Sequence, residues 1–102
     1  MNIVVEPPYA RHYDDLDPVT KVRIANAVDG KLRTWTGRGG TRRVVPPGPG
    51  MPTLHEVYVG DFRIIFCRHG DNLHLLDVAK KGQGGRQDRA LRASGNFCKD
   101  NH

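Results

Sequence analysis

The apolar and polar positions of the chain alternate most regularly between Leu54 and Gln83. This stretch reads LHEVYVGDFRIIFCRHGDNLHLLDVAKKGQ, with two alternating apolar segments around Gly60-Asp61 and a third after Gly70-Asp71. Gly and Asp tolerate the positive backbone dihedral angles of tight turns, so each pair favours a two-residue hairpin loop. The pattern therefore predicts a three-stranded antiparallel meander.

A loop at Gly60-Asp61 fixes the register of the first hairpin, because side chains alternate across a strand. The predicted pairs are Val59 with Phe62, Tyr58 with Arg63, Val57 with Ile64 and Glu56 with Ile65. One face is then apolar, with Val57, Val59, Phe62, Ile64 and Phe66. The other face, called the mixed face below, carries Glu56, Tyr58, Arg63, Ile65 and Cys67.

The third strand has two alternative registers. A two-residue loop at the second turn pairs Cys67 with His74 and places His74 and Lys80 on the mixed face. The remaining pairs in that register are Ile65 with Leu76 and Arg63 with Val78. A three-residue loop brings Asp77 and Lys81 to the mixed face instead. We prefer the first register because it gathers polar groups together, and both lysines stay candidates for the site.

The N-terminal third predicts one strand and two helices. Asn2 to Glu6 is a short apolar run ended by Pro7-Pro8, and a helix-compatible segment, ARHYDDLDP, follows Tyr9. Asp17 can cap a second helix that begins with Pro18. Its apolar stripe is Val22, Ala25, Val28 and Leu32, widened by Ile24, and the helix ends near Trp35 or Gly37. We expect this stripe to pack on the apolar face of the meander.

A long basic loop separates the second helix from the meander. It runs from Gly37 to Pro52 and reads GRGGTRRVVPPGPGMP, with room for one brief extended piece at Arg42 to Val45. Loops of this length are often functional, and its arginines favour contact with phosphates. A solvated connector without function is the alternative. The arginines in question are Arg38, Arg42 and Arg43.

The order of elements predicts an α+β domain. A small antiparallel sheet, made of the N-terminal strand and the C-terminal three-stranded meander, carries the two N-terminal helices on one face. A short C-terminal helix is expected at Gln87 to Ala93, with Arg86, Arg89 and Arg92 along one side. The mixed face is expected to be open, as a shallow cleft.

Length and cysteine content bear on the number of domains and on the cellular compartment. The 102 residues are expected to form one domain, 1–102, at a size where a single core needs no disulfide. Cys67 and Cys98 lack metal-ligand spacing and are interpreted as reduced thiols, with a single disulfide as the alternative. No apolar run reaches eighteen residues. We therefore expect a cytoplasmic protein with no membrane partner.

The positive charge lies in the second part of the chain. Through Trp35 there are five basic and five acidic residues, which leaves eleven of the sixteen basic and six of the eleven acidic residues for the remainder. That remainder carries the whole formal charge of +5. A surface of this sign suits a polyanion or an acidic partner, although basic residues also simply keep small domains soluble.

The chain resembles the RelE/ParE superfamily of small bacterial toxins, most closely its HigB-like, phage-derived branch. The resemblance covers the amphipathic helices before Trp35, the segment LHEVYVGDFRIIF and the segment LLDVAKKGQ. A strand with Glu, a turn and an aromatic-Arg pair are typical of that family, here Glu56, Phe62 and Arg63. The double lysine Lys80-Lys81, followed by a basic helix, resembles the HigB-like ending.

This resemblance implies the toxin of a type II toxin-antitoxin system. Such a toxin is an endoribonuclease that acts on messenger RNA, commonly on the ribosome, and a cognate antitoxin holds it inactive. The resemblance implies neither a cofactor nor a metal. Two alternatives stay open, a ParE-like inhibitor of DNA gyrase and a catalytically degenerate binding or regulatory member.

Attack of a ribose 2′-hydroxyl on the adjacent phosphate needs a base, cations for the developing charge and an acid for the leaving oxygen. Arg63 is the best phosphate candidate, because its planar fork of donors matches two phosphate oxygens. The catalytic candidates are Glu56, Arg63, His74, Lys80 and Lys81. The RNA-binding candidates are Arg38, Arg42, Arg43, Tyr58, Arg68, Arg86, Arg89 and Arg92.

Each candidate also has a structural interpretation. Arg63 can pair with Glu56 as a cross-strand ion pair, and a lone strand histidine such as His74 is more often a structural residue. Many ribonucleases of this superfamily carry a tyrosine or histidine near the C-terminus, where this chain offers Phe97 and His102. Phe97 cannot transfer a proton. The general acid is then His74, a lysine, or absent.

Overall fold

The structure is a computed structural model that describes residues 2–35, 42–44 and 54–80. These residues form an α+β arrangement of helices and a five-stranded sheet. The elements in chain order are β1 (Asn2–Val5), α1 (Pro7–Asp14), α2 (Pro18–Ala27), the π-helical turn η1 (Val28–Leu32), β2 (Arg42–Val44), β3 (Leu54–Val59), β4 (Phe62–His69) and β5 (Asn72–Lys80). None of the described helices is long and apolar enough to cross a membrane.

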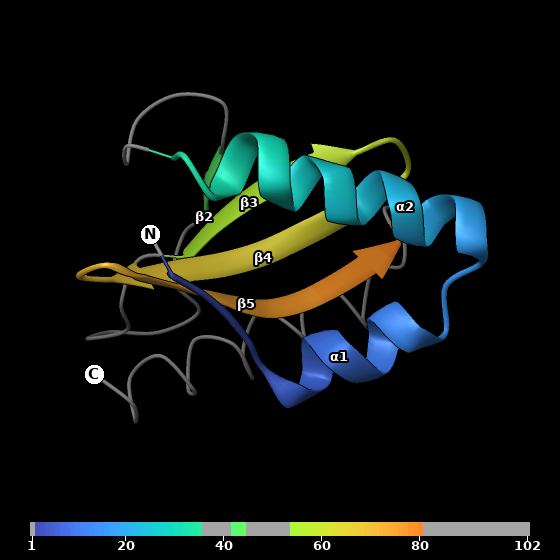
Figure 1. The fold of residues 1–102 in the computed structure, drawn as a ribbon, viewed down its shortest axis with the longest axis horizontal. Coiled ribbons are helices and arrows are strands. Elements are labelled where there is room, and N and C mark those ends of the chain that lie inside the picture. Colours follow the sequence, from blue (N-terminus) through green and yellow to red (C-terminus); the bar gives the residue numbers. More distant parts are fainter. Residues whose placement is uncertain (1, 36–41, 45–53, 81–102) are drawn as a thin grey trace.

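The sheet has the strand order β1-β5-β4-β3-β2 (Figure 1). β1 runs parallel to β5, with Asn2 opposite Asn72 and Val5 opposite Leu75. The sheet is therefore mixed, and the prediction of a wholly antiparallel sheet is wrong. An apolar run specifies a strand but not its direction, which here follows from the long helical connection between β1 and the meander. β2 lies in the basic loop, where a brief extended piece was predicted.

The first hairpin has the predicted register. Val59 pairs with Phe62, and Glu56 pairs with Ile65 at the far end of the ladder. Gly60 has a positive φ of 58°, as a tight turn of this kind requires. The two predicted faces of β3 and β4 are thus confirmed, and their apolar side joins the helices in one core.

The second hairpin keeps its predicted register only near the turn. His69 pairs with Asn72 and Cys67 pairs with His74, but the register shifts between Ile65 and Phe66. Leu75 opposes Phe66 and Asp77 opposes Ile65, so Leu76 is the extra residue of a β-bulge. A one-residue insertion moves every later side chain to the opposite face.

Two predictions change because of this bulge. Arg63 pairs with Ala79 and not with Val78, and Lys80 opposes Phe62, a residue of the apolar face. Asp77 consequently joins the mixed face and Lys80 leaves it. The bulge resolves a conflict in the sequence, since the regular register would turn the Asp77 carboxylate toward the helices and Val78 away from the core.

Both helices begin at proline. α1 begins at Pro7, earlier than predicted, because the first helical turn tolerates a residue without an N–H. α2 begins at Pro18 as predicted, and the Asp17 carboxylate accepts the backbone N–H of Thr20 at 3.2 Å. The helix continues into η1, where the Arg33 N–H donates to the Val28 carbonyl five residues earlier.

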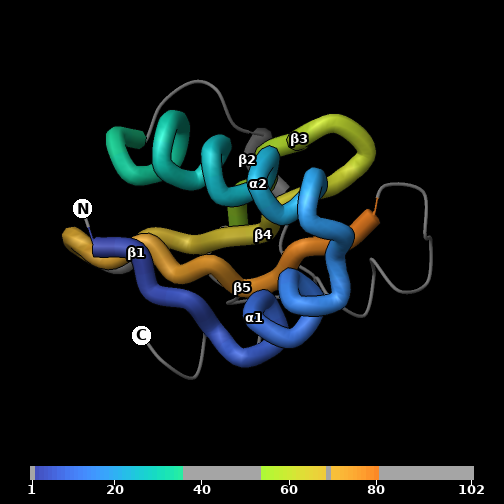
Figure 2. Tube along the Cα trace, turned by 45° about the vertical axis from the view of Figure 1, so that its right-hand side comes forward, coloured from blue at the N-terminus to red at the C-terminus, as the bar shows by residue number. Residues whose placement is uncertain are grey.

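The helices and one side of the sheet form the main core. Figures 1 and 2 show α2 lying over β3 and β4 on one face of the sheet, and α1 beside β5. The buried stripe of the second helix is Ile24, Val28 and Leu32, at four-residue steps, whereas Val22 is 59% exposed. The predicted stripe was therefore wrong at Val22, which lies two residues from Ile24 and so on another side of the helix.

The mixed face is mostly buried, with Tyr58 as an exposed member, so the expectation of an open cleft is wrong. Glu56, Arg63 and Asp77 are at most 8% exposed. The same face carries apolar side chains that favour burial, namely Leu54, Ile65 and Cys67. Cys67 takes part in a disulfide, which overturns its interpretation as a reduced thiol. Cys98 and the expected helix at Gln87 to Ala93 lie outside the described residues.

Candidate functional site

The polar centre of the mixed face is a cluster of Tyr58, Glu56 and Arg63. The Tyr58 hydroxyl donates to Oε1 of Glu56 at 3.1 Å. Nε of Arg63 lies 3.1 Å from Oε2 of the same carboxylate. Tyr58 and Arg63 are direct partners across the hairpin, so the β3–β4 register brings this cluster together.

Arg63 is buried with unused donor capacity. Its Nε and Nη2 are buried and make no well-aligned hydrogen bond in the described part of the chain. The short distance to Glu56 is therefore a charge contact without an aligned N–H···O bond. A buried donor without an acceptor carries a desolvation cost, and such a group in a native fold calls for a functional or structural explanation.

Tyr58 connects this cluster to the surface. Its residue is 37% exposed, whereas Glu56 is 4% and Arg63 is 8% exposed. A ligand can therefore touch the phenol directly. Through the hydrogen bond from Tyr58 to Glu56, a proton taken up by the phenol oxygen can be matched by transfer of the phenol proton to the buried carboxylate.

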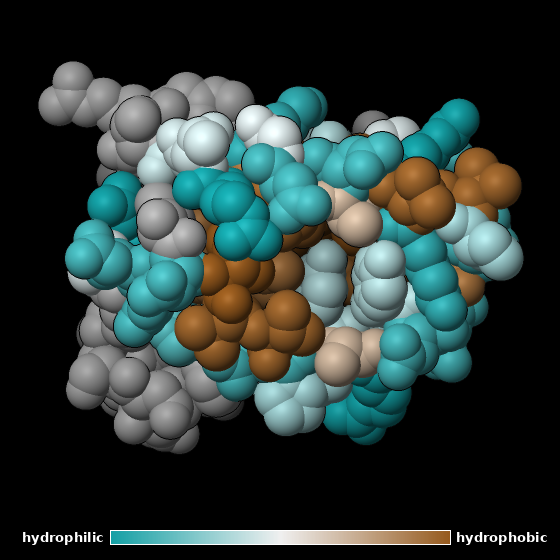
Figure 3. Space-filling model, in the orientation of Figure 1, coloured by the Kyte–Doolittle hydropathy of each residue, from teal (hydrophilic) through white to brown (hydrophobic). Residues whose placement is uncertain are grey.

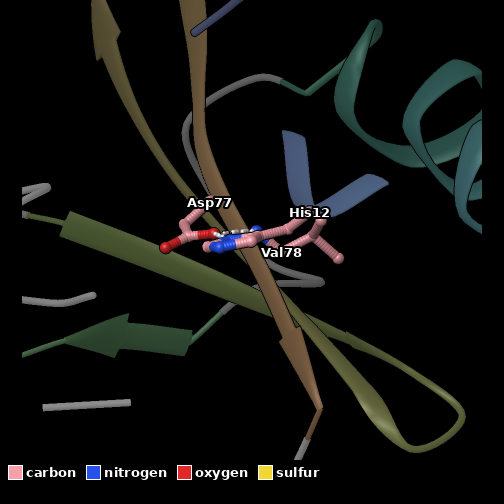
Figure 4. Close-up of polar contacts among 3 residues, drawn as sticks. All are labelled: His12, Asp77 and Val78. Atoms are coloured by element: carbon pink, nitrogen blue, oxygen red, sulfur yellow. Dashed lines mark hydrogen bonds and ion pairs between the residues drawn. The ribbon is translucent and has the colours of Figure 1, made fainter. Parts of the chain in front are cut away.

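A second polar pair lies where α1 runs beside β5. Oδ1 of Asp77 is 2.6 Å from Nδ1 of His12, and it also accepts the backbone N–H of Val78 at 2.8 Å. Figure 4 shows the imidazole of His12 and the carboxylate of Asp77 directed toward one another. The Asp77 side chain is 6% exposed and that of His12 is 39% exposed. A buried acid thus holds a histidine that reaches the surface.

Sequence reasoning missed this pair. It placed Asp77 on the mixed face only in the alternative register, and it did not single out His12. The bulge at Leu76 is what turns Asp77 to this face, and no local pattern marks it. α1 also begins at Pro7, earlier than predicted, and this early start sets the position of His12 along β5.

His74 lies in a different contact. Its Nδ1 is 2.9 Å from Oε1 of Glu6, the residue before α1, and both side chains are largely buried. His74 is on the mixed face, as predicted from its pairing with Cys67. Its contact with Glu6 ties β5 to the start of α1, which fits the structural interpretation of this histidine.

The other predicted site residues are dispersed. Arg68 is exposed and its Nε donates to the Gly70 carbonyl at 2.9 Å. Lys80 is exposed at the end of β5, and the backbones of Arg42 and Arg43 pair with Glu56 and His55. The candidates outside the described residues are Arg38, Lys81, Arg86, Arg89 and Arg92.

A cavity of about 290 Å³ opens between α1 and α2. Its floor is apolar, with Ile3 and Leu75, and its charged lining residues are Asp14, Asp29 and Arg33. Figure 3 shows apolar residues gathered around a hollow on this face. Burial, and to a lesser extent the neighbouring Tyr13, raises the pKa of the Tyr9 phenol in its wall.

Within residues 2–35, 42–44 and 54–80, no three His, Cys, Asp or Glu residues cluster as a metal site would require. No family model and no curated protein matches the chain. A solved structure does: the archaeal RelE–RelB complex from Pyrococcus horikoshii OT3. The TM-score is 0.57 at 12% identity, over 81% of this chain and 97% of the other.

At this identity the similarity concerns the fold. It agrees with the RelE-like fold that the sequence resemblance implied, and it does not single out the HigB-like branch. The chain therefore shares the fold of the archaeal RelE.

Proposed function

We propose that this protein is the toxin of a type II toxin-antitoxin pair and that it cleaves messenger RNA on the ribosome. The proposal is supported by the fold, which it shares with RelE over almost all of that chain. The observation that carries the chemistry is the exposed Tyr58 hydroxyl, hydrogen-bonded to a buried carboxylate beside an arginine.

In this mechanism Glu56 is the base and Tyr58 relays the proton. The ribose 2′-hydroxyl gives its proton to the Tyr58 oxygen while the Tyr58 proton passes to Glu56. The 2′-oxygen then attacks phosphorus, and the bond from phosphorus to the 5′-oxygen breaks. The products are a 2′,3′-cyclic phosphate and a 5′-hydroxyl end. Arg63 is a cation beside the relay, 3.1 Å from Glu56, and its unused donors suit the developing negative charge.

A test uses Tyr58→Phe, which keeps the ring and removes the relaying hydroxyl. Wild type and variant are expressed from an inducible promoter in a bacterial host, and new messenger RNA 5′ ends are mapped. Growth arrest with new ends, both lost in Tyr58→Phe, supports the proposal. The double variant Glu56→Ala, Arg63→Ala removes both the proposed base and the neighbouring cation, but it also removes a buried ion pair. Its folding is therefore checked first by circular dichroism.

One observation favours a second function. Glu56 and Arg63 are almost completely buried, as expected for a pair that holds the sheet together. A fold of this superfamily without an accessible catalytic pair suits a binding protein, such as an inhibitor of DNA gyrase. Arrest without new RNA ends, and gyrase inhibition that tolerates Arg63→Ala, would select this function. No arrest at all would favour a regulatory member.

The proposed partner is a cognate antitoxin. The matching structure is a complex of RelE with RelB. On this chain, the cavity between α1 and α2, together with Val5 at 51% exposure, offers an apolar surface that an amphipathic segment could cover. The net charge of +5 suits an acidic antitoxin as well as RNA. We place the pair in the cytoplasm, where messenger RNA and ribosomes are found.

A further inference from the structure

We propose that His12 is the general acid of this reaction and that Asp77 is the residue that positions it. The inference rests on the proposed function and supplies the group that its mechanism lacks. After attack by the 2′-oxygen, the departing 5′-oxygen needs a proton. Of the two C-terminal residues considered for this role, Phe97 has no acidic proton, and His102, like Phe97, lies outside the described residues.

The contact between His12 and Asp77 holds one nitrogen of the imidazole. Nδ1 of His12 lies 2.6 Å from Oδ1 of Asp77, which is within hydrogen-bonding distance. Asp77 is also fixed by the backbone N–H of Val78, so its carboxylate has a defined orientation. A buried carboxylate that holds one ring nitrogen sets the orientation of the other.

The second ring nitrogen of His12 is available to a substrate. The contact with Asp77 uses Nδ1, and Nε2 makes no hydrogen bond or ion pair with any other residue that the structure describes. The side chain is 39% exposed. By contrast, the His74 side chain, which contacts Glu6 in the same way, is 20% exposed. Of these two histidines, His12 is the better placed to pass a proton to a bound molecule.

The sheet places this acid opposite the proposed base. Glu56 and Asp77 are both partners of Ile65, one from β3 and one from β5. They therefore lie in one row across the mixed face, two strand spacings or about 10 Å apart between backbones. Tyr58 extends from the β3 side and His12 from the α1 side. In-line cleavage needs its base and acid on opposite sides of the phosphate, and Tyr58 belongs to β3 whereas His12 belongs to α1, which packs on β5, with β4 between the two strands.

The proton balance is complete with these groups. Protonated His12 gives the proton on Nε2 to the 5′-oxygen as the bond from phosphorus to that oxygen breaks. Glu56 ends protonated and His12 ends neutral, and exchange with water restores both. Asp77 keeps its charge throughout and does not contact the substrate.

The test compares two leaving groups. A messenger RNA with its ordinary 5′-oxygen at the mapped cleavage site is compared with one whose bridging 5′-oxygen is replaced by sulfur. A thiolate leaves without protonation, so a general acid matters only for the oxygen substrate. We expect His12→Gln to lower the cleavage rate of the oxygen substrate by about 100-fold or more. The same variant should cleave the sulfur substrate at nearly the wild-type rate. Asp77→Asn should show the same selective loss, but smaller.

The matched control is His74→Gln, which breaks the other histidine–carboxylate contact between β5 and the α1 region. Whatever this change does to the rate, it should do equally to both substrates. Equal slowing of both substrates by His12→Gln, or no slowing, overturns the inference while the ribonuclease function stands. A folded wild-type protein that cleaves neither substrate rejects the proposed function itself, and the inference with it.

Discussion

Nε of Arg63 lies 3.1 Å from Oε2 of Glu56, and both side chains are more than nine-tenths buried. Removing one charge from such a pair leaves the other buried without compensation. We therefore expect Glu56→Gln to lower the free energy of unfolding by about 3–5 kcal/mol. Urea denaturation followed by circular dichroism measures this loss.

The double variant Glu56→Leu, Arg63→Met removes both charges, and with them the free-energy cost of taking those charges out of water. Apolar replacement of a whole buried ion pair is often neutral or stabilising. We expect the double variant to be more stable than Glu56→Gln alone. If instead the double variant loses at least as much free energy of unfolding as Glu56→Gln, the ion pair itself stabilises the sheet, in addition to compensating two buried charges.

The elements that sequence reasoning predicted correctly are those set by neighbouring residues. The β3–β4 register follows from one two-residue turn and from the alternation around it, and the start of α2 follows from Asp17 and Pro18. Both signals lie within a few residues of the structure that they determine. The pairing of Tyr58 with Arg63, and thus the first polar cluster, could therefore be predicted.

The elements that it missed depend on distant parts of the chain. The bulge at Leu76 is favoured because it turns Val78 into the core beside the helices and Asp77 onto the mixed face, a balance decided by packing against the helices. The direction of β1 depends on its pairing with β5, and the position of His12 depends on how α1 follows β1 at that edge of the sheet. The burial of Arg63 was also missed, because an arginine in a strand pattern indicates exposure unless its surroundings are known.

Asp17 should make stability depend on pH in the acid range. Its carboxylate accepts hydrogen bonds from the Thr20 hydroxyl and backbone N–H, which lower its pKa below the ordinary value. The unfolded chain then binds this proton more readily, so the stabilisation is complete above the ordinary pKa of about 3.9 and disappears as pH falls through the folded value.

Asp17→Asn is the matched variant, because asparagine caps helices nearly as well but does not titrate. We expect the difference in urea midpoint between wild type and Asp17→Asn to be constant near neutral pH and to shift against wild type below about pH 4. A difference that stays the same across the whole acid range would show that the cap hydrogen bonds do not favour the ionised form.

Tyr9 should act at the opposite end of the pH scale. Its phenol is 5% exposed, and burial raises its pKa above the ordinary value of about 10. The folded chain then holds the proton that the unfolded chain releases, so stability is complete below the ordinary pKa and is lost as pH rises toward the folded value. Alkaline urea denaturation measures this loss.

Tyr9→Phe removes the titrating group and keeps the ring. No hydrogen bond joins the Tyr9 hydroxyl to another residue of the described segments, so the variant should match wild type near neutral pH. Above about pH 10 it should lose less stability than wild type. Parallel alkaline curves for the two proteins would mean that the Tyr9 phenol ionises as readily in the folded chain as in the unfolded one.

The disulfide at Cys67 should tie stability to redox conditions. Cys67 is 1% exposed in the central strand β4, and it is covalently linked. A disulfide restricts the unfolded chain, and its reduction typically lowers the free energy of unfolding by about 2–4 kcal/mol. We expect added reductant to lower the urea midpoint of the wild-type protein. Cys67→Ala should have the same midpoint with and without reductant, because it cannot form the bond.

This comparison bears on the proposed cytoplasmic setting, since thiols there are kept reduced. A small domain has about 5–15 kcal/mol of stability in all, so losing the disulfide would remove a large fraction of it. If the protein is stable when reduced, it could act freely in that compartment. If it unfolds on reduction, it would need a partner bound to its folded form, because binding stabilises the folded state by mass action. Equal midpoints for reduced and oxidised wild-type protein would remove this dependence.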